Sequence, residues 1–237
     1  MNLALDSAAK QKRLNGATEP EEILQEGLAR IVGPVALASS FSIEDIVLID
    51  LLQKIDRKVQ VFALDTGRLH EETLEIAETI RLRYQLEIGW YFPERAAVEK
   101  LEREKGLFSF RDSLQNRQHC CQIRKVEPLQ RALKGLAGWI TGQRREQGTS
   151  RNLLHPIEID HNNGGIIKLN PLCYWSEEQL NNYVKAQRLP INRLHLQGYP
   201  SIGCAPCSRA VQPGEDLRAG RWWWENPEHK ECGLHKR

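Results

Sequence analysis

Short apolar runs of strand length alternate with stretches of helical periodicity through most of the chain. The pattern predicts strands at 35–39, 59–64, 86–92, 138–142 and 166–169. It predicts helices at 20–31, 43–52, 71–84, 96–105, 121–133 and 177–187. Alternation of this kind is typical of strands joined by helical crossovers. We therefore expect a single α/β domain with a mostly parallel sheet flanked by helices.

The periodic pattern is confined to the middle of the chain. Residues 1–30 read as a helical lead-in, because Pro20 suits the first turn of a helix. Residues 31–210 carry the alternation and form the expected main domain. After Leu189 the pattern gives way to Pro, Gly and Trp. We expect residues 211–237 to form a flexible C-terminal tail.

Composition narrows the class of protein. The chain has 33 basic and 31 acidic side chains, a net charge of +2, so it lacks the basic excess of proteins that coat nucleic acid. Aliphatic runs such as VALASSF, DIVLIDLL and VQVFALD recur through the first half, so the chain is not of the disordered class. No apolar stretch approaches the roughly 20 residues that span a bilayer, and the N-terminus lacks a secretory signal. We expect a cytoplasmic protein that binds neither nucleic acid nor membranes.

The cysteines predict a metal or redox centre. Cys120 and Cys121 are adjacent, and Cys204 and Cys207 form a CxxC pair. Zinc accepts four thiolates, but adjacent cysteines fit one tetrahedral ion poorly because both sulfurs must bend back onto one atom. In a [4Fe–4S] cluster each thiolate binds a different iron, so this cofactor is favoured over zinc. Cys173 lies in an apolar run and reads as a core residue.

Three polar segments follow predicted strands directly, where ligands of open α/β sheets gather. Ser39–Asp45 offers small hydroxyl residues at the start of a helix, which favours an anion. Leu64–Arg68 makes a tight turn, and Thr141–Gln147 combines a glycine with two arginines. Each segment taken alone also has a purely structural interpretation. The first fits an N-cap, the second a turn and the third a solvated charge run. Together they favour a nucleotide or phosphate crevice.

One cysteine lies close to the C-terminus. Cys232 has Lys230 and His235 near it in sequence, and cationic neighbours favour the thiolate. A terminal cysteine of this kind is either a reactive nucleophile or functionally silent.

These motifs, in this order, resemble the assimilatory adenylylsulfate (APS) reductases, the iron–sulfur branch of the APS/PAPS reductase family. The resemblance rests on SSFSIED, LDTG, CC-x-x-R-K, TG-x-RRE-Q, C-x-x-C and the terminal KECGLH, and covers roughly residues 30–235. It implies a fold of the adenine-nucleotide alpha-hydrolase type, related to ATP pyrophosphatases. It also implies reduction of adenosine 5′-phosphosulfate to sulfite and AMP, in sulfate assimilation and cysteine biosynthesis.

The resemblance further implies a dithiol reductant, thioredoxin or glutaredoxin, and a homo-oligomer. Plant members carry a fused thioredoxin-like domain, whereas this chain ends five residues after Cys232. We therefore expect the reductant to be a separate protein.

The same resemblance assigns roles to individual residues. Cys232 matches the nucleophile that forms an S-sulfocysteine intermediate. The cluster ligands match Cys120, Cys121, Cys204 and Cys207. The nucleotide cradle matches Ser39, Ser40, Phe41, Ser42, Glu44, Asp45, Leu64 and Gly142. Basic groups near the phosphosulfate match Lys125, Arg144, Arg218, Arg221 and His235.

The reaction that the resemblance implies needs basic groups close to the substrate. A sulfate ester repels a thiolate, so cations must screen its charge before attack. Lys125 follows Cys121 by four residues, about one helical turn, and so we expect it beside the cluster.

Two alternatives stay open from the sequence. A cluster-bearing enzyme of this kind could accept phosphoadenylylsulfate instead of, or as well as, adenylylsulfate. A nucleotide-binding module with a purely structural cluster or zinc would leave Cys232 unused. The chain has no GxGxxG motif, so a nicotinamide or flavin mechanism has no support.

Overall fold

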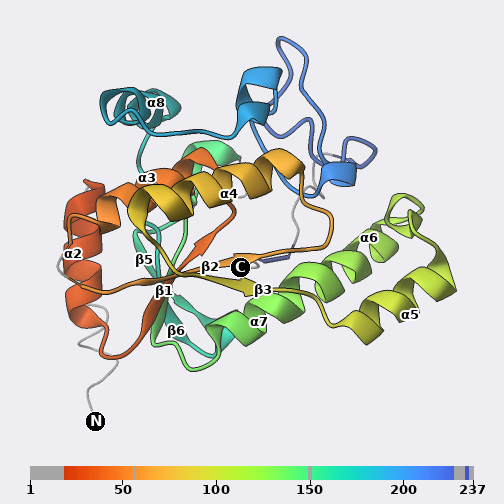
Figure 1. The fold of residues 1–237 in the computed structure, drawn as a ribbon, viewed down its shortest axis with the longest axis horizontal. Coiled ribbons are helices and arrows are strands. Elements are labelled where there is room, and N and C mark those ends of the chain that lie inside the picture. Colours follow the sequence, from red (N-terminus) through yellow and green to blue (C-terminus); the bar gives the residue numbers. More distant parts are fainter. Residues whose placement is uncertain (1–18, 56, 149–150, 227–232, 235–237) are drawn as a thin grey trace. The chain divides into compact units, whose positions relative to one another are not determined.

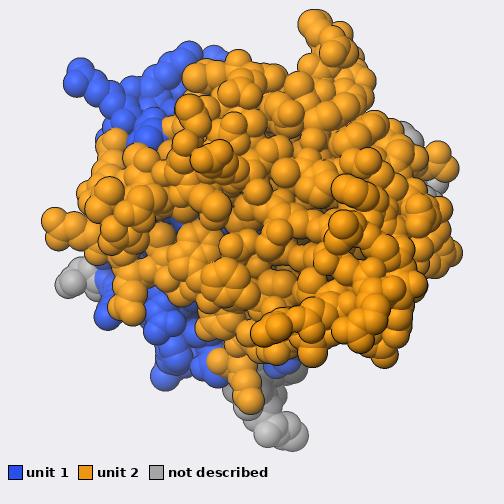
Figure 2. Space-filling view, turned by 45° about the vertical axis from the view of Figure 1, so that its right-hand side comes forward, with its two compact units in different colours: residues 1–61, 135–190 blue, residues 62–134, 191–237 orange. Residues whose placement is uncertain are grey.

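The computed structural model describes residues 19–55, 57–148, 151–226 and 233–234. The chain divides into two compact units, residues 1–61 with 135–190 and residues 62–134 with 191–237 (Figure 2). Each unit therefore combines two stretches of chain that are distant in sequence. The strand order in the sheet is β3-β2-β1-β4-β6-β5, and Figure 1 traces the elements. The predicted α/β class with a mostly parallel sheet is confirmed.

Four strands belong to the first unit. They are β1 (Val35–Ser39), β4 (Gly138–Ile140), β5 (Ile157–Asp160) and β6 (Ile166–Leu169). β4 pairs in parallel with both β1 and β6, so that Gly138 lies opposite Val35 on one side and Ile167 on the other. β5 pairs with β6 in the antiparallel sense. β1 and β4 are almost wholly buried, which explains why they read as continuous apolar runs.

In the described part of the chain, three α-helices complete this unit. They are α2 (Pro20–Arg30), α3 (Ile43–Leu52) and α8 (Glu177–Ala186). α2 packs on β6 at Gly27, where an added Cβ would lie 2.8 Å from the side chain of Leu169. α8 begins at a capping box, in which Ser176 and Gln179 satisfy each other's backbone N–H groups.

The second unit holds the remaining regular elements. The strands are β2 (Gln60–Leu64), whose first two residues belong to the other unit, and β3 (Ile88–Tyr91). The helices are α4 (Glu71–Tyr84), α5 (Arg95–Lys105), α6 (Leu114–Cys121) and α7 (Glu127–Leu133). From Ile191 onward the described chain forms loops and short 3₁₀ turns. No helix among the described residues is long and apolar enough to cross a membrane.

The structure corrects the predicted helix at 121–133. A helix already begins at Leu114, because the Ser113 side chain caps it by accepting a hydrogen bond from the N–H of Asn116 at 3.1 Å. The cysteine pair therefore ends one helix instead of opening another. Gln122–Val126 then form a π-helical turn before α7. Pro128 explains this turn, because proline has no N–H for the preceding turn and its ring crowds the carbonyl four residues back.

Strand β5 was not predicted from the sequence. Its four residues are only partly buried, and its single neighbour in the sheet is β6. The turn that joins them runs through His161–Asn163 and two glycines with positive φ, Gly164 and Gly165. The expected domain boundaries at residues 30 and 210 stay predictions.

Candidate functional site

The loop after β1 is organised around one buried carboxylate. Asp45, in the first turn of α3, accepts hydrogen bonds from the Ser40 N–H at 2.6 Å, the Ser40 hydroxyl at 2.8 Å and the Ser42 hydroxyl at 3.2 Å. Ser39 accepts the N–H of Phe41 through its hydroxyl at 3.2 Å. Phe41 itself adopts a left-handed conformation, with φ of 56°. The hydroxyl groups that suggested an anion site are thus engaged in shaping the loop.

Burial changes the acidity of this carboxylate. Desolvation raises the pKa of Asp45 to about 6, and the neighbouring charge of Glu44 adds to the rise. The hydrogen bonds from Ser40 and Ser42 act in the opposite direction, since they favour the ionised form. The start of α3 therefore holds a carboxylate that titrates close to neutral pH.

Gly142, shortly after β4, meets this loop at close range. A Cβ on Gly142 would lie 2.5 Å from Oδ1 of Asp45 and 2.8 Å from Cβ of Glu44, so only glycine fits. Arg144 is also buried and donates through Nε to Glu44 at 3.0 Å. Gln147 donates to the same carboxylate oxygen at 2.8 Å. The predicted cradle residues 39–45 thus lie together with Gly142 and Arg144, and their contact with a nucleotide stays a prediction.

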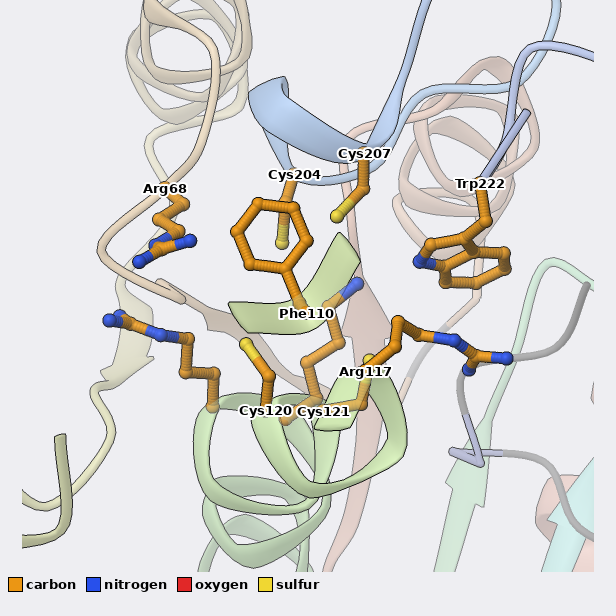
Figure 3. Close-up of a pocket in the computed structure, with 10 residues that line it drawn as sticks. Arg68, Phe110, Arg117, Cys120, Cys121, Cys204, Cys207 and Trp222 are labelled. Atoms are coloured by element: carbon orange, nitrogen blue, oxygen red, sulfur yellow. The ribbon is translucent and has the colours of Figure 1, made fainter. Parts of the chain in front are cut away.

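The second unit contains a pocket lined by four thiols. Cys120 and Cys121 end α6, whereas Cys204 precedes the 3₁₀ turn η7 (Ala205–Cys207) and Cys207 is its last residue. Figure 3 shows the sulfurs of the two pairs facing one another across the pocket. All four are free cysteines. Among the described residues, no three His, Cys, Asp or Glu side chains are arranged to hold one metal ion.

The turn after β2 supports the CxxC pair. The carbonyl of Arg68 accepts the N–H of Ala205 at 2.8 Å, and the Cys204 thiol lies 3.3 Å from the hydroxyl of Thr66. Leu64 is the last residue of β2, two positions before Thr66. The LDTG segment, interpreted from sequence as part of a ligand crevice, thus positions one of the cysteine pairs.

Basic side chains surround the thiols. Lys125 and Arg124 come from the π-helical turn and are both buried. Arg124 donates to the Thr66 carbonyl at 2.7 Å and to Glu102 at 2.6 Å. Lys125 lines the thiol pocket, as expected from its spacing after Cys121, although a π turn connects the two instead of an α-helical one.

These charges make the two thiols of the CxxC pair unequal. Burial alone would raise the pKa of Cys204, but the positive charge of Lys125 and the hydrogen bond with Thr66 outweigh it and lower the pKa. Burial raises the pKa of Cys207 to about 12, and the charge of Cys204 adds to the rise. Cys204 is therefore the more readily ionised thiol of the pair.

Two buried donors at the pocket have no hydrogen-bond partner among the described residues. They are Nε1 of Trp222 and Nε of Arg124. In Figure 3 the indole nitrogen of Trp222 lies on the side of the ring nearer the cysteines. A buried donor without an acceptor is costly, so a group with acceptor atoms in this pocket would satisfy it.

Arg221 lies near the CxxC pair and is held by its loop. It donates to the Ser201 hydroxyl at 3.3 Å and the Ile202 carbonyl at 3.1 Å. A Cβ on Gly203 would lie 2.4 Å from its guanidinium, so the glycine leaves room for Arg221 in this position. Arg218 is partly exposed and does not line the thiol pocket. The predicted Cys232 and His235 lie outside the described residues.

Sequence reasoning missed several residues of this pocket. Thr66 and Arg68 were interpreted as part of a ligand crevice or of a simple turn, and Trp222 as part of the tail. Arg117 gave no signal, because the helix that carries it was not predicted. The unusual run of three tryptophans at 222–224 was the one sequence feature that pointed to a packed segment there.

Comparisons with known proteins show which family the chain resembles. The chain matches the phosphoadenosine phosphosulfate reductase domain family over residues 34–210. It is 47% identical over 216 residues to an adenosine 5′-phosphosulfate reductase of Allochromatium vinosum, covering 91% of this chain and 84% of that protein. It resembles a crystal structure of phosphoadenylyl-sulfate reductase from Candida auris, with a TM-score of 0.69, 28% identity, and coverage of 85% and 94%.

A more distant likeness is to Candida glabrata FMN adenylyltransferase. The TM-score is 0.58 at 16% identity, covering 94% of this chain and 77% of that one. At this identity the likeness concerns the fold alone, and it agrees with the adenine-nucleotide alpha-hydrolase fold expected from the sequence.

Proposed function

The chain belongs to the APS/PAPS reductase family, and from that premise we propose that it reduces adenosine 5′-phosphosulfate to sulfite and AMP. One observation carries the proposal: both cysteine pairs, distant in sequence, line one pocket together with Lys125. The relative from Allochromatium vinosum is named for the same substrate. The role would be in sulfate assimilation, which supplies reduced sulfur for cysteine.

The pocket fits a [4Fe–4S] cluster held by Cys120, Cys121, Cys204 and Cys207. Four thiols from two distant segments line its wall, and four thiolates are the usual ligands of such a cluster. The unpartnered Trp222 N–H would gain an acceptor in a cluster sulfur. A bound cluster would supply a compact charge beside Lys125 and fix the two cysteine pairs relative to each other.

The chain's own side chains would bind the substrate and screen its charge. The loop 39–45 with Gly142 offers a close-packed surface at a helix start, which suits an adenosine phosphate. Lys125 and Arg221 would neutralise the phosphosulfate. Because both are cations fixed by their surroundings, they lower the cost of bringing a thiolate to an anion.

The reaction then needs one nucleophile and one external dithiol. The Cys232 thiolate would attack the sulfur of the phosphosulfate, forming a sulfur–sulfur bond and breaking the sulfur–oxygen bond to the phosphate, so that AMP leaves with the bonding electrons. A thiolate of thioredoxin or glutaredoxin would attack Cys232 sulfur and release sulfite. The second thiol of that protein would resolve the mixed disulfide, which regenerates Cys232 and oxidises the partner. A thiol-based reductant suits the reducing cytoplasm.

Mass spectrometry of anaerobically purified protein tests this proposal. Wild-type protein mixed with adenosine 5′-phosphosulfate, without a dithiol partner, should gain one sulfonate on the peptide that contains Cys232. The Cys232→Ser variant should bind AMP and hold iron, yet form no adduct and release no sulfite. A sulfonate on another cysteine, or turnover in the Ser variant, would contradict the mechanism. A colourless protein that contains zinc would contradict the cluster.

A second candidate substrate is phosphoadenylyl sulfate, because the matched family and the Candida auris structure carry that name. Its extra 3′-phosphate requires a cation of its own. Comparing kcat/KM for the two nucleotides under the same conditions separates a strict adenylylsulfate reductase from an enzyme that uses both.

A further inference from the structure

Arg111, in the turn that precedes α6, lies against aromatic rings from two distant parts of the chain. A cation within about 6 Å of a ring centroid is attracted to the face of that ring. Four rings meet this condition, those of Phe108 at 5.4 Å, Phe110 at 5.6 Å, Trp224 at 5.6 Å and Trp223 at 5.9 Å. One guanidinium therefore joins the segment before α6 to the tryptophan segment near the C-terminus.

The four rings also contact one another, and we call them the aromatic layer. The ring centroid of Phe110 lies 6.1 Å from that of Phe108 and 6.0 Å from that of Trp224. Trp223 and Trp224 meet edge to face at 4.7 Å. Tilted and edge-to-face contacts are the favoured arrangements of aromatic pairs. The aromatic layer is thus continuous from one segment to the other.

One side of the aromatic layer borders the thiol pocket, and the other side borders solvent. Phe110 is 2% exposed and lines the pocket, and in Figure 3 its ring points toward the CxxC pair. Phe108 and Trp223 are 58% and 39% exposed. Because the inner and outer rings touch, little more than one layer of aromatic side chains lies between the pocket and the solvent here.

Arg111 also contacts the turn that carries the CxxC pair. Its Nη2 donates to the carbonyl of Pro206, between Cys204 and Cys207, at 3.5 Å. It forms no ion pair with another described residue. The contacts of this exposed cation are therefore with the rings and with one carbonyl, so its removal leaves no described carboxylate without a partner.

The tryptophan segment is itself held against the cysteine-bearing helix. Arg117, on α6, donates to Glu225 through Nε at 3.0 Å and through Nη2 at 2.8 Å, and the two side chains are 1% and 8% exposed. The Arg117 guanidinium lies 4.6 Å from the centroid of the Trp222 ring. A bidentate pair fixes geometry more closely than a single contact, so the part of the aromatic layer after Trp222 has a firm support.

We propose that the aromatic layer, with Arg111 as its central contact, keeps water and dissolved dioxygen out of the thiol pocket. The inference rests on the proposed function insofar as the pocket holds an iron–sulfur cluster. The apolar shell around a metal site controls the access of solvent to it. Oxidation of cysteine sulfur likewise follows its exposure. The aromatic layer would therefore prolong the life of the iron–sulfur cluster without binding substrate.

The test compares wild type with Arg111→Met in the full chain, purified anaerobically. Methionine keeps an apolar stem but removes the charge. After transfer to air-saturated buffer, the visible absorbance of the iron–sulfur cluster should decay roughly tenfold faster in the variant, because losing the cation–π contacts makes local opening of the aromatic layer easier. The Tm should fall by at most about 4 °C, since Arg111 is exposed.

Two further variants define the role more closely. Arg111→Lys keeps a cation over the rings but loses the planar guanidinium, so it should recover part of the wild-type lifetime. Phe110→Leu shortens the ring that borders the pocket and should also speed the decay. It tests the aromatic layer without changing any charge.

Arg83→Met is the matched control. Arg83 is exposed on α4, and its guanidinium lies 5.4 Å from the centroid of the Tyr84 ring. Neither residue lines the thiol pocket. This variant loses a cation–π contact elsewhere in the same unit, so its absorbance should decay at the wild-type rate.

The outcomes separate this inference from the proposed function. Wild-type decay rates in both Arg111→Met and Phe110→Leu overturn the protective role. Decay in Arg83→Met as fast as in Arg111→Met, or a Tm that falls far beyond the expected limit, shows general destabilisation and also overturns it. Wild-type protein purified without iron contradicts the proposed iron–sulfur cluster alone. Alkylation of the buried Cys121 and Cys204 by iodoacetamide then replaces the absorbance, and Arg111→Met should again raise the rate roughly tenfold.

Discussion

Asp45 is a buried carboxylate that accepts three hydrogen bonds, two from Ser40 and one from Ser42. Its pKa of about 6 in the folded protein lies above the ordinary value of about 3.9. Between these two values the folded state holds a proton that the unfolded state has lost. This group therefore stabilises the fold below about pH 4, and its contribution disappears as the pH rises through about 6.

We predict a measurable pH dependence from this group. Raising the pH from 4 to 7 should remove roughly 2 kcal/mol of its contribution to the free energy of unfolding, since each pKa unit corresponds to about 1.36 kcal/mol. The Asp45→Asn variant should lack this component. Urea unfolding of both proteins at several pH values measures it, with the exposed Glu178→Gln as control. Parallel pH profiles for wild type and Asp45→Asn would show that the carboxylate is ionised throughout.

Lys125 is a buried cation that lines the thiol pocket. Its place there was predicted from its position four residues after Cys121. In Lys125→Ala, we expect a loss of about 2–4 kcal/mol of transition-state stabilisation, a fall in kcat/KM of roughly 30- to 1,000-fold. Iron content should persist, because lysine is not a thiolate ligand. Lys134→Ala, at an exposed site after α7, is the control for charge alone. Equal kinetics in the two variants would remove Lys125 from the substrate site.

The helices and strands show where the hydrophobic periodicity of the sequence is enough to predict an element and where it is not. Helix α4 (Glu71–Tyr84) and strand β1 were predicted at their observed bounds. A long amphipathic run or a short apolar run of this kind is consistent with one type of secondary structure only. The helix start at Leu114 was missed because residues 114–121 have almost no apolar periodicity. The side chain of Ser113 caps this helix and specifies its start instead. The π-helical turn depends on Pro128, a local backbone constraint that a hydrophobic pattern does not record.

The contact between the end of β4 and the start of α3 gives an element-scale prediction. In Gly142→Ala the added methyl group overlaps Oδ1 of Asp45, so the loop after β1 must shift. We expect the Kd for AMP to rise at least about tenfold, as displaced close contacts commonly cost more than 1.4 kcal/mol. Iron content should be unchanged, because the four thiols belong to other segments. Calorimetric titration with AMP measures the first quantity, and an unaltered Kd would show that the loop does not hold the nucleotide.

At the scale of the whole molecule, thiols that are more than 80 residues apart in sequence are gathered in one pocket. Replacing any one of Cys120, Cys121, Cys204 or Cys207 by Ser should lower iron content and activity together, because a hydroxyl is a poor iron ligand. Cys173→Ser is the control, since this buried thiol, whose pKa burial raises to about 12, does not line the pocket. Iron loss in Cys173→Ser equal to that in the other four would show that the ligand set is wrong.

The sequence predicted the parts of the site that are short, contiguous motifs. The loop at Ser39–Asp45, Gly142 and the two cysteine pairs each stand out by residue type and by position after a strand or in a pair. Arg117 and Trp222 do not, because their roles arise from contacts with residues far along the chain. A buried ion pair between positions 117 and 225 leaves no trace in local spacing.

The interleaving of the two units has a consequence for biosynthesis. The segment 62–134 packs with residues from 191 onward, so its unit is incomplete until the ribosome has added roughly 80 residues beyond Cys121. At about 5–20 residues per second, that interval lasts about 4–16 s. During it Cys120 and Cys121 are present without Cys204 and Cys207. The proposed four-thiol cluster would therefore form only after translation of its ligands is complete, and folding of this unit must wait for slow, long-range contacts.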